Sequence, residues 1–152
     1  MKAQETVGFQ VKATWQSIVK MYNRLTHEDD SSQAIGYVLI NVKKEGIPVT
    51  KIAPLMGIEP TSLSRLLKTM EEKGLIYRRK DDVDRRVVKL FLTQKGLELK
   101  KISRKNVLDY NKMIRDNISD EDMEVFFSVM NRIRKMTCQV GLPDDESPMK
   151  KS

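Results

Sequence analysis

The sequence of 152 residues contains one cysteine and one histidine, and this scarcity excludes several kinds of site. Cys138 cannot form an internal disulfide, and with His27 it is too few for a metal site of the usual Cys/His type. A Ser-His-Asp or Cys-His catalytic arrangement would depend on His27, which lies in a polar run and is expected to be solvated. No glycine-rich phosphate-binding loop is present. The scarcity of Cys and His does not exclude metal sites made only of carboxylates. We expect neither an enzyme nor a cofactor.

Long apolar runs are also missing. The longest, such as residues 37–40, are far below the roughly 18 residues of a membrane span. The amino terminus has no apolar signal region. We therefore expect a cytoplasmic protein without a membrane partner, with one domain over residues 1–140. Residues 141–152 are polar, contain two prolines and show no periodicity, so a disordered tail is expected there.

The net charge of +7 is concentrated in one part of the chain. Residues 73–105 contain 12 Lys or Arg and four Asp or Glu, whereas the rest contains 16 basic and 17 acidic residues. A localised basic excess is typical of a surface that faces a polyanion. A solvated helix face is the alternative for any such cluster.

Apolar residues recur at helical spacing in the first part of the chain. Over residues 11–25 they fall at steps of three and four, which predicts a helix with one narrow apolar stripe. Ser31 or Ser32 can cap a second helix that runs to about Lys44, and residues 46–48 end it.

Two short helices separated by a glycine turn are predicted next. Thr50 is placed to cap the first, and Gly57 closes it in the left-handed conformation. Pro54 removes one of its early hydrogen bonds, so this helix is expected to begin late or to be slightly distorted. Pro60 stands at the first position of the following helix, which stops at Gly74. Such a pair is a helix-turn-helix, whose second helix lies in the major groove of DNA.

A hairpin with a charged loop is predicted between Gly74 and Gly96. Two runs rich in Ile, Tyr, Val, Leu and Phe flank polar and charged residues that only Val83 interrupts. The loop carries both signs of charge, so it is more specific than a plain basic tail. A charged hairpin directly behind a helix indicates contact with nucleic acid.

Two longer helices are predicted after the hairpin. Thr93 can cap the first, and Ser119 with Asp122 forms a near capping box for the second. The first and last helices of the chain have narrow apolar seams, which suit packing between subunits as well as within one chain. The expected fold class is mainly α with a small β-hairpin wing (α+β), a winged helix-turn-helix.

Several short motifs occur together in the central region, over about 45 residues. They are Ile52-Ala53-x-x-Met56-Gly57-Ile58, Thr61-Ser62-Leu63-Ser64-Arg65-Leu66, Met70-Glu71-Glu72-Lys73-Gly74-Leu75-Ile76, Arg78-Arg79, Asp84-Arg85-Arg86 and Leu92-Thr93-Gln94-Lys95-Gly96. With these motifs the chain resembles the MarR family of bacterial transcriptional regulators. The Asp-x-Arg wing followed by Leu-Thr-x-x-Gly is the specific part of the match.

The resemblance implies an obligate homodimer that binds a pseudo-palindromic operator in double-stranded DNA. It places the DNA-binding winged helix at about residues 46–93 and the dimerisation helices at about 7–29 and 94–140. Similar proteins commonly bind small, often aromatic or anionic, ligands near the junction of these regions, so a small-molecule effector is a candidate partner. Repression is favoured, because a protein that occupies a promoter blocks it without any further contact. The residues do not encode whether transcription is repressed or activated, so activation is the alternative.

Five side chains project from the outer face of the predicted recognition helix. Arg65 lies about one and a half turns into it, where a guanidinium can donate two hydrogen bonds to a guanine edge. Thr61, Ser62 and Ser64 are short donors suited to phosphate oxygens or base edges, and Lys68 suits backbone phosphate. Local capping or solvation is the alternative for the hydroxyls.

In the wing, Arg86 matches the arginine that this family inserts into the minor groove, where narrow A·T tracts concentrate negative potential. A carboxylate that faces phosphates is unfavourable, so Asp84 is expected to pair with an arginine and brace the loop. Arg85, Lys80 and Lys89 are phosphate candidates. The two arginines before Lys80 alternate on a strand, so one of them is expected to face DNA.

Two other interpretations compete. A winged helix can instead contact protein or RNA, because the fold does not dictate the ligand; the arginines of the helix and wing favour duplex DNA. A redox switch at Cys138 is disfavoured because it lacks a clustered partner, and because peroxide-sensing relatives carry their cysteine in the first helix. Arg134 and Lys135 could nevertheless lower its pKa.

Overall fold

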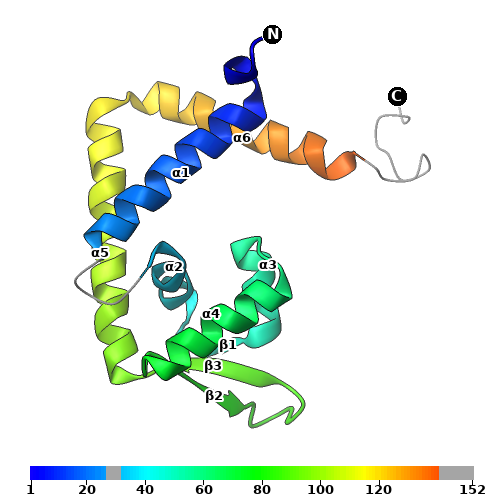
Figure 1. Ribbon diagram of the computed structural model, residues 1–152, viewed down its shortest axis with the longest axis vertical. Coiled ribbons are helices and arrows are strands. Elements are labelled where there is room, and N and C mark those ends of the chain that lie inside the picture. The colour runs from blue at the N-terminus through cyan, green and yellow to red at the C-terminus, as the bar shows by residue number, and fades with distance from the viewer. Residues whose placement is uncertain (27–31, 141–152) are drawn as a thin grey trace. The chain divides into compact units, whose positions relative to one another are not determined.

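The computed structural model describes residues 1–26 and 32–140, and Figure 1 shows its helices and strands. The elements in chain order are η1 (Ala3–Glu5), α1 (Val7–Leu25), α2 (Gln33–Asn41), β1 (Ile47–Pro48), η3 (Val49–Lys51), α3 (Ile52–Met56), α4 (Pro60–Glu72), β2 (Ile76–Lys80), β3 (Val88–Leu92), α5 (Gln94–Asn117) and α6 (Asp120–Gln139). They form two compact units, Met1–Leu108 and a second that begins at Asp109, so α5 contributes to both. His27, Ser31 and residues 141–152 lie outside the described residues. The structure therefore does not test the expected solvation of His27, a cap at Ser31 or a disordered tail.

No helix in the described ranges combines the length and the apolar character that a membrane span requires.

The core of the first unit is formed by α2, α3, α4 and the sheet. Its largest fully buried side chains are Val38, Leu39, Val42, Leu67, Met70, Leu75 and Leu90. On α4, Leu63, Leu67 and Met70 are buried at helical spacing, as predicted. Burial of each such side chain contributes roughly 1.5–3 kcal/mol. The inner face of α4 is therefore fixed by packing, and its outer face is left to solvent.

The turn between α3 and α4 forms as predicted at Gly57, which has φ +62°. The predicted cap at Thr50 is wrong, because Thr50 lies inside the 3-10 turn η3 and α3 begins only at Ile52. Pro54 provides the physical reason: it has no N–H, so the α-helical hydrogen bond to the carbonyl of Thr50 cannot form. Pro60 stands at the start of α4, as predicted.

The predicted hairpin is present, but it belongs to a sheet of three antiparallel strands in the order β1-β3-β2. Tyr77 of β2 is paired with Phe91 of β3. The additional strand β1 pairs Ile47 with Leu90, where only the end of a helix was predicted. Two residues are too few to show the alternation by which a strand is recognised. The preceding helix α2 ends at Asn41, three residues before the predicted Lys44.

Thr93 joins the hairpin to α5. Its hydroxyl accepts a hydrogen bond from the Gly96 amide at 3.1 Å, which is the predicted cap, and donates to the Gly74 carbonyl at 2.6 Å. A Cβ at Gly96 would lie 2.0 Å from the carbonyl oxygen of Leu75, so the backbones approach too closely for any side chain. These contacts fix the base of the hairpin against the start of α5.

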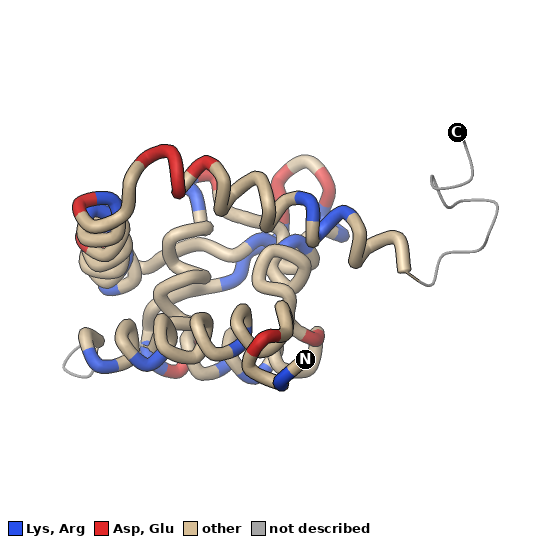
Figure 2. The backbone as a smooth tube through the Cα atoms, turned by 90° about the horizontal axis from the view of Figure 1, so that it is seen from above, with Lys and Arg blue, Asp and Glu red and all other residues tan. Residues whose placement is uncertain are grey.

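Helices α1 and α6 bury none of their residues within the structure. Trp15 on α1 is 50% exposed, and Phe126 and Phe127 on α6 are 52% and 47% exposed. Ser119 caps α6 by accepting a hydrogen bond from the Asp122 amide, as predicted. The acidic first turn of α6 is coloured red in Figure 2. The apolar seams of both helices are thus only partly covered by the described residues.

Candidate nucleic-acid interface

Helix α4 exposes all five side chains that were predicted on its outer face, namely Thr61, Ser62, Ser64, Arg65 and Lys68. The Ser64 hydroxyl donates to the carbonyl of Pro60 at 3.0 Å, which is a local bond of the kind that the sequence left open for the hydroxyls. Arg65 and Lys68 project from the same face without an acidic partner among the described residues. A helix with such a face can present hydroxyl, guanidinium and ammonium donors to one groove of a duplex.

The loop of the hairpin is organised around Asp81. Its carboxylate accepts hydrogen bonds from the amides of Val83 and Asp84 at 3.2 and 3.0 Å. It also lies 2.7 Å from the ammonium of Lys89 on β3. The hydrogen bond from Lys89 and those from the loop amides lower the pKa of Asp81 to about 2. Asp81 therefore stays ionised at neutral pH and holds the loop in one shape.

Asp84 and Arg86 form the predicted ion pair at the tip of the same loop. The guanidinium of Arg86 donates two hydrogen bonds to the two carboxylate oxygens of Asp84, at 3.0 and 3.1 Å. The Arg86 amide donates to the same carboxylate at 3.1 Å. The bonds from Arg86 lower the pKa of Asp84, and Asp84 raises the pKa of Arg86. The side chain of Arg86 is still 91% exposed, so it is oriented without being covered.

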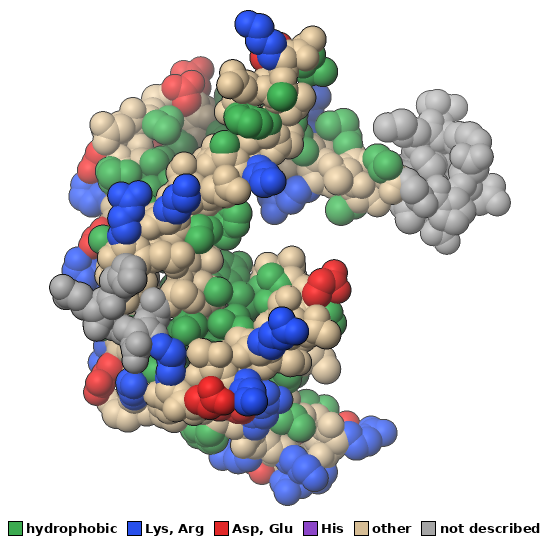
Figure 3. Space-filling view, in the orientation of Figure 1, with side chains coloured by type: hydrophobic (Ala, Val, Ile, Leu, Met, Phe, Trp, Pro, Cys, Tyr) green, Lys and Arg blue, Asp and Glu red, His purple; other side chains and the backbone are tan. Residues whose placement is uncertain are grey.

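The other wing cations differ in how firmly they are held. Arg85 lies 4.0 Å from Asp82, a distance at which an exposed ion pair contributes little. Lys80 is exposed and makes no ion pair with any described residue. Lys89, by contrast, is held against Asp81 and is only 27% exposed, so its charge is partly compensated. Figure 3 shows Lys and Arg side chains gathered at the tip of the hairpin.

The two adjacent arginines of β2 point to opposite faces, as the alternation of a strand requires. Arg78 forms an ion pair with Glu71 on α4, at 2.5 Å. Arg79 lies over the ring of Phe91 with its guanidinium carbon 4.5 Å from the ring centroid. The Glu71 to Arg78 contact therefore joins the recognition helix to the wing.

Two sets of positioning contacts, those of Asp81 and that between Glu71 and Arg78, were not predicted from the sequence. Asp81 could have been found, because an aspartate at the start of a tight turn commonly accepts from the amides two and three residues on. The Glu71 to Arg78 contact could not have been found, because it joins a helix to a strand whose relative placement is set only by the fold.

Cys138 is exposed and is a free thiol.

A helix-turn-helix followed by a charged hairpin defines a winged helix-turn-helix protein. The MarR family model matches residues 42–88, which include α3, α4 and most of the wing. Over this region the chain is similar to the MarR family, in agreement with the resemblance of its motifs. This similarity also agrees with the expectation that the chain is not an enzyme.

Curated relatives are regulators of the helix-turn-helix type. The uncharacterised transcriptional regulator YybA of Bacillus subtilis is 24% identical over 99 residues, which cover 65% of this chain and 66% of YybA. The transcriptional repressor MdtR of the same organism is 38% identical over 61 residues, or 40% of this chain and 39% of MdtR. The matched region therefore spans two thirds or less of these relatives.

Solved structures share the fold over most of the chain. MepR of S. aureus, in a complex with DNA, has a TM-score of 0.78 at 19% identity, covering 86% of this chain and 98% of MepR. A MarR family regulator from Listeria monocytogenes complexed with a 26mer DNA has a TM-score of 0.76 at 18% identity, covering 89% of both chains. These likenesses show the winged helix fold.

Proposed function

We propose that this protein is a sequence-specific transcriptional regulator that binds double-stranded DNA through α4 and the wing. The observation that carries the proposal is the pair of Asp84 and Arg86, in which a guanidinium that is 91% exposed is held in one direction, on a hairpin that follows a helix with exposed polar side chains. An arginine held this way loses less conformational entropy when it enters a groove. The MepR and Listeria structures, which are named as DNA complexes, support the same interpretation.

The recognition helix α4 supplies base readout in this proposal. Arg65 donates to a guanine in the major groove, and Lys68 binds a backbone phosphate. Thr61 and Ser62, in the first turn of α4, bind phosphate oxygens or base edges, and Ser64 keeps its hydroxyl acceptor capacity while it donates to the helix backbone.

The wing supplies the second contact. Arg86 enters the minor groove, and Lys80 and Arg85 bind phosphates on either side of it. Lys89 contributes less, because it neutralises Asp81 within the hairpin. The ion pair of Glu71 and Arg78 fixes β2 against α4, so that the helix and the wing contact DNA at the same time.

We propose that the protein acts as a homodimer. The exposed aromatic side chains of α1 and α6, among them Trp15, Phe126 and Phe127, form apolar faces that a second copy can cover. The winged helix then corresponds to about residues 46–93, and the dimerisation region to α1 and about residues 94–140, within a domain of residues 1–140. A symmetric dimer requires a pseudo-palindromic operator with half-sites roughly 34 Å apart.

Repression by occlusion of a promoter, in the cytoplasm, is the mode of action that we propose. The curated relative MdtR is named as a repressor, which supports this direction. A small-molecule effector that favours one spacing of the two recognition helices would make the repression responsive to ligand.

The experiment that tests this function is a binding assay with duplexes tiled across the region upstream of the protein's own gene. We expect one duplex to bind at least about 1,000-fold more tightly than a scrambled duplex at the same salt concentration. Arg65→Ala should weaken binding to that duplex more than it weakens binding to the scrambled duplex, so the ratio of the two affinities should fall. Equal affinity for all duplexes, or preferential binding of RNA, would overturn the proposal.

A further inference from the structure

The loop of the wing carries one apolar residue, Val83, among charged neighbours. Val83 is 95% exposed, and among the described large apolar side chains only that of Met1, near the chain end, is more exposed. Val83 therefore contributes almost nothing to the core of this chain. Contact with a partner would remove nearly all of its apolar surface from water, which is favourable.

The backbone on both sides of Val83 is fixed. The amides of Val83 and Asp84 donate to one carboxylate oxygen of Asp81, at 3.2 and 3.0 Å. The Asp81 amide donates to the Val87 carbonyl at 2.8 Å, and the Val87 amide donates to the Asp84 carbonyl at 3.0 Å, which closes the loop. Because valine is β-branched, its side chain also has few rotamers. Val83 would thus lose little conformational entropy on entering a binding site.

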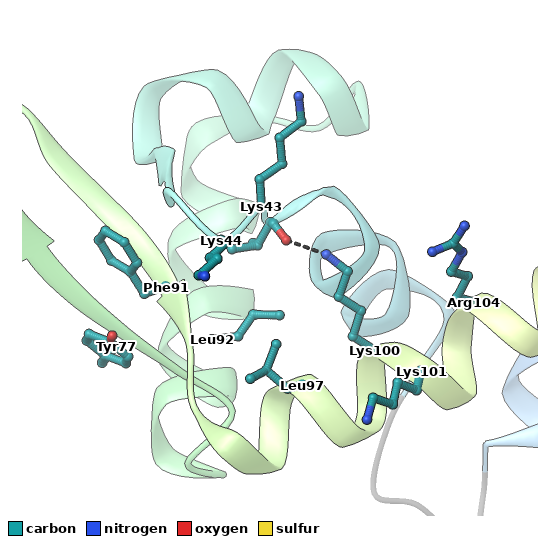
Figure 4. Close-up of a pocket in the computed structure, with 10 residues that line it drawn as sticks. Lys43, Lys44, Tyr77, Phe91, Leu92, Leu97, Lys100, Lys101 and Arg104 are labelled. Carbon is teal, nitrogen blue, oxygen red and sulfur yellow. Dashed lines mark hydrogen bonds between the residues drawn. The ribbon is translucent and has the colours of Figure 1, made fainter.

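The strands behind this loop form a firm stem. Tyr77 of β2 and Phe91 of β3 are cross-strand partners whose rings are stacked, with centroids 5.6 Å apart and planes 18° from parallel (Figure 4). Arg79 lies over the same Phe91 ring. The loop is therefore carried by a hairpin whose strands are held together by side chains as well as by backbone hydrogen bonds.

The carboxylates around Val83 have basic partners within the hairpin. The contacts are Asp81 to Lys89 at 2.7 Å, Asp82 to Arg79 and Arg85 at 3.9 and 4.0 Å, and Asp84 to Arg86 at 3.0 Å. Val83 itself has no charge with which to attract a phosphate. A contact made by Val83 is therefore decided by shape and by hydration, and it should not depend on salt.

The minor groove of DNA distinguishes base pairs by one polar group. A·T pairs in either orientation show only acceptors there, whereas a G·C pair adds the 2-amino donor of guanine. An apolar side chain at the floor of the groove cannot accept from this donor, and a buried donor without a partner is unfavourable. Arg86, in the same loop, responds instead to the negative potential of a narrow groove.

We propose that Val83 enters the minor groove together with Arg86 and excludes guanine from the base pairs beneath the wing. This inference rests on the proposed function and adds a specificity-determining residue to it. Arg86 supplies affinity through its charge, and Val83 discriminates against the 2-amino group. The wing therefore selects a minor groove that lacks this group.

The test compares binding to two duplexes of equal length, one of alternating dG-dC and one of alternating dI-dC. Inosine lacks only the 2-amino group of guanine, so both duplexes show the same donors and acceptors in the major groove. We expect the wild type to bind the dI-dC duplex at least about fivefold more tightly. Melting temperatures of all variants should match that of the wild type, because Val83 is exposed.

Two substitutions of Val83 separate its role from that of Arg86. Val83→Thr keeps the volume and adds a hydroxyl that can accept from the 2-amino group, so its preference should fall below about twofold. Val83→Ile stays apolar and should keep at least about the fivefold preference of the wild type. Neither substitution changes the charge, so both should keep the wild-type salt dependence.

Equal binding of the two duplexes by the wild type would overturn the role of Val83, and so would a preference that Val83→Thr retains in full or Val83→Ile loses. Arg86→Ala shows whether the proposed function fails as well. If Arg86→Ala binds both duplexes more weakly and with a smaller salt dependence, the wing still binds DNA and only the role of Val83 is wrong. If Arg86→Ala binds both as the wild type does, the wing contact of the proposed function is wrong too.

Discussion

Gly96→Ala is the substitution whose effect follows most directly from the packing. The added Cβ would lie 2.0 Å from the backbone oxygen of Leu75, whereas real Cβ contacts are essentially never under 3.0 Å, so one backbone must move by about 1 Å. The Leu75 side chain is 1% exposed, and its carbonyl also accepts a hydrogen bond from the Thr93 amide at 3.1 Å. The acceptor is backbone within a packed junction, so it cannot swing away as a long side chain would.

The magnitude is the difference of two effects. Insertion of a methyl group into a well-packed site costs about 1–3 kcal/mol. Alanine in place of glycine inside a helix increases the free energy of unfolding by about 0.5–1 kcal/mol. The central values of these two ranges give a net loss of about 1–2 kcal/mol of unfolding free energy. This loss should lower the melting temperature by about 2–8 °C for a chain of this size.

Thermal unfolding followed by circular dichroism measures this loss, at one protein concentration for all variants. Gly8→Ala is the control, because Gly8 lies on α1 and a Cβ there would meet nothing within 4 Å. We expect Gly8→Ala to melt at or slightly above the wild-type temperature. If Gly96→Ala melts as high as Gly8→Ala, the close approach of α5 to the base of the hairpin is not as described.

Three further predictions concern the core, the wing and the apolar helices. Leu67→Ala should lower the free energy of unfolding by about 2–5 kcal/mol in a urea titration, because Leu67 is 1% exposed. The pKa of Asp81 is lowered to about 2 from 3.8, so its stabilisation of the loop is present above about pH 4 and is lost as the pH falls toward 2. The Val83 amide shift should follow that titration in the wild type and not in Asp81→Asn. Phe126→Lys should convert a dimer to a monomer in sedimentation experiments at micromolar concentration, and an unchanged mass would remove α6 from the proposed interface.

The helices of the winged part were predictable because local signals mark their ends. Proline at the first position of α4 and glycine after α3 act through backbone geometry alone, and the fold does not alter them. The ion pair of Asp84 and Arg86 was predictable for a similar reason. The partners are two residues apart in one loop, and an unpaired carboxylate beside phosphates is unfavourable.

The errors came where a distant part of the chain decides the structure. Strand β1 forms only because Leu90 and Lys89 offer backbone partners, and two residues carry no periodic signal of their own. The cap at Thr50 is the exception and was wrong for a local reason, because Pro54, four residues later, cannot donate the hydrogen bond that this cap requires. A groove between the sheet and α5 unites residues from Val42 to Arg104, and no sequence spacing brings these together.

The most direct test of the central claim is the salt dependence of operator binding by the wild type, Arg86→Ala and Lys2→Ala. Lys2 is exposed and precedes α1. Arg86→Ala and Lys2→Ala each remove one positive charge, so they change the net charge equally. We expect Arg86→Ala to bind about tenfold more weakly and to reduce the slope of log K against log salt by about 1, while Lys2→Ala keeps the wild-type affinity and slope. Equal affinity and slope for all three proteins would contradict the role of the braced wing arginine in binding DNA.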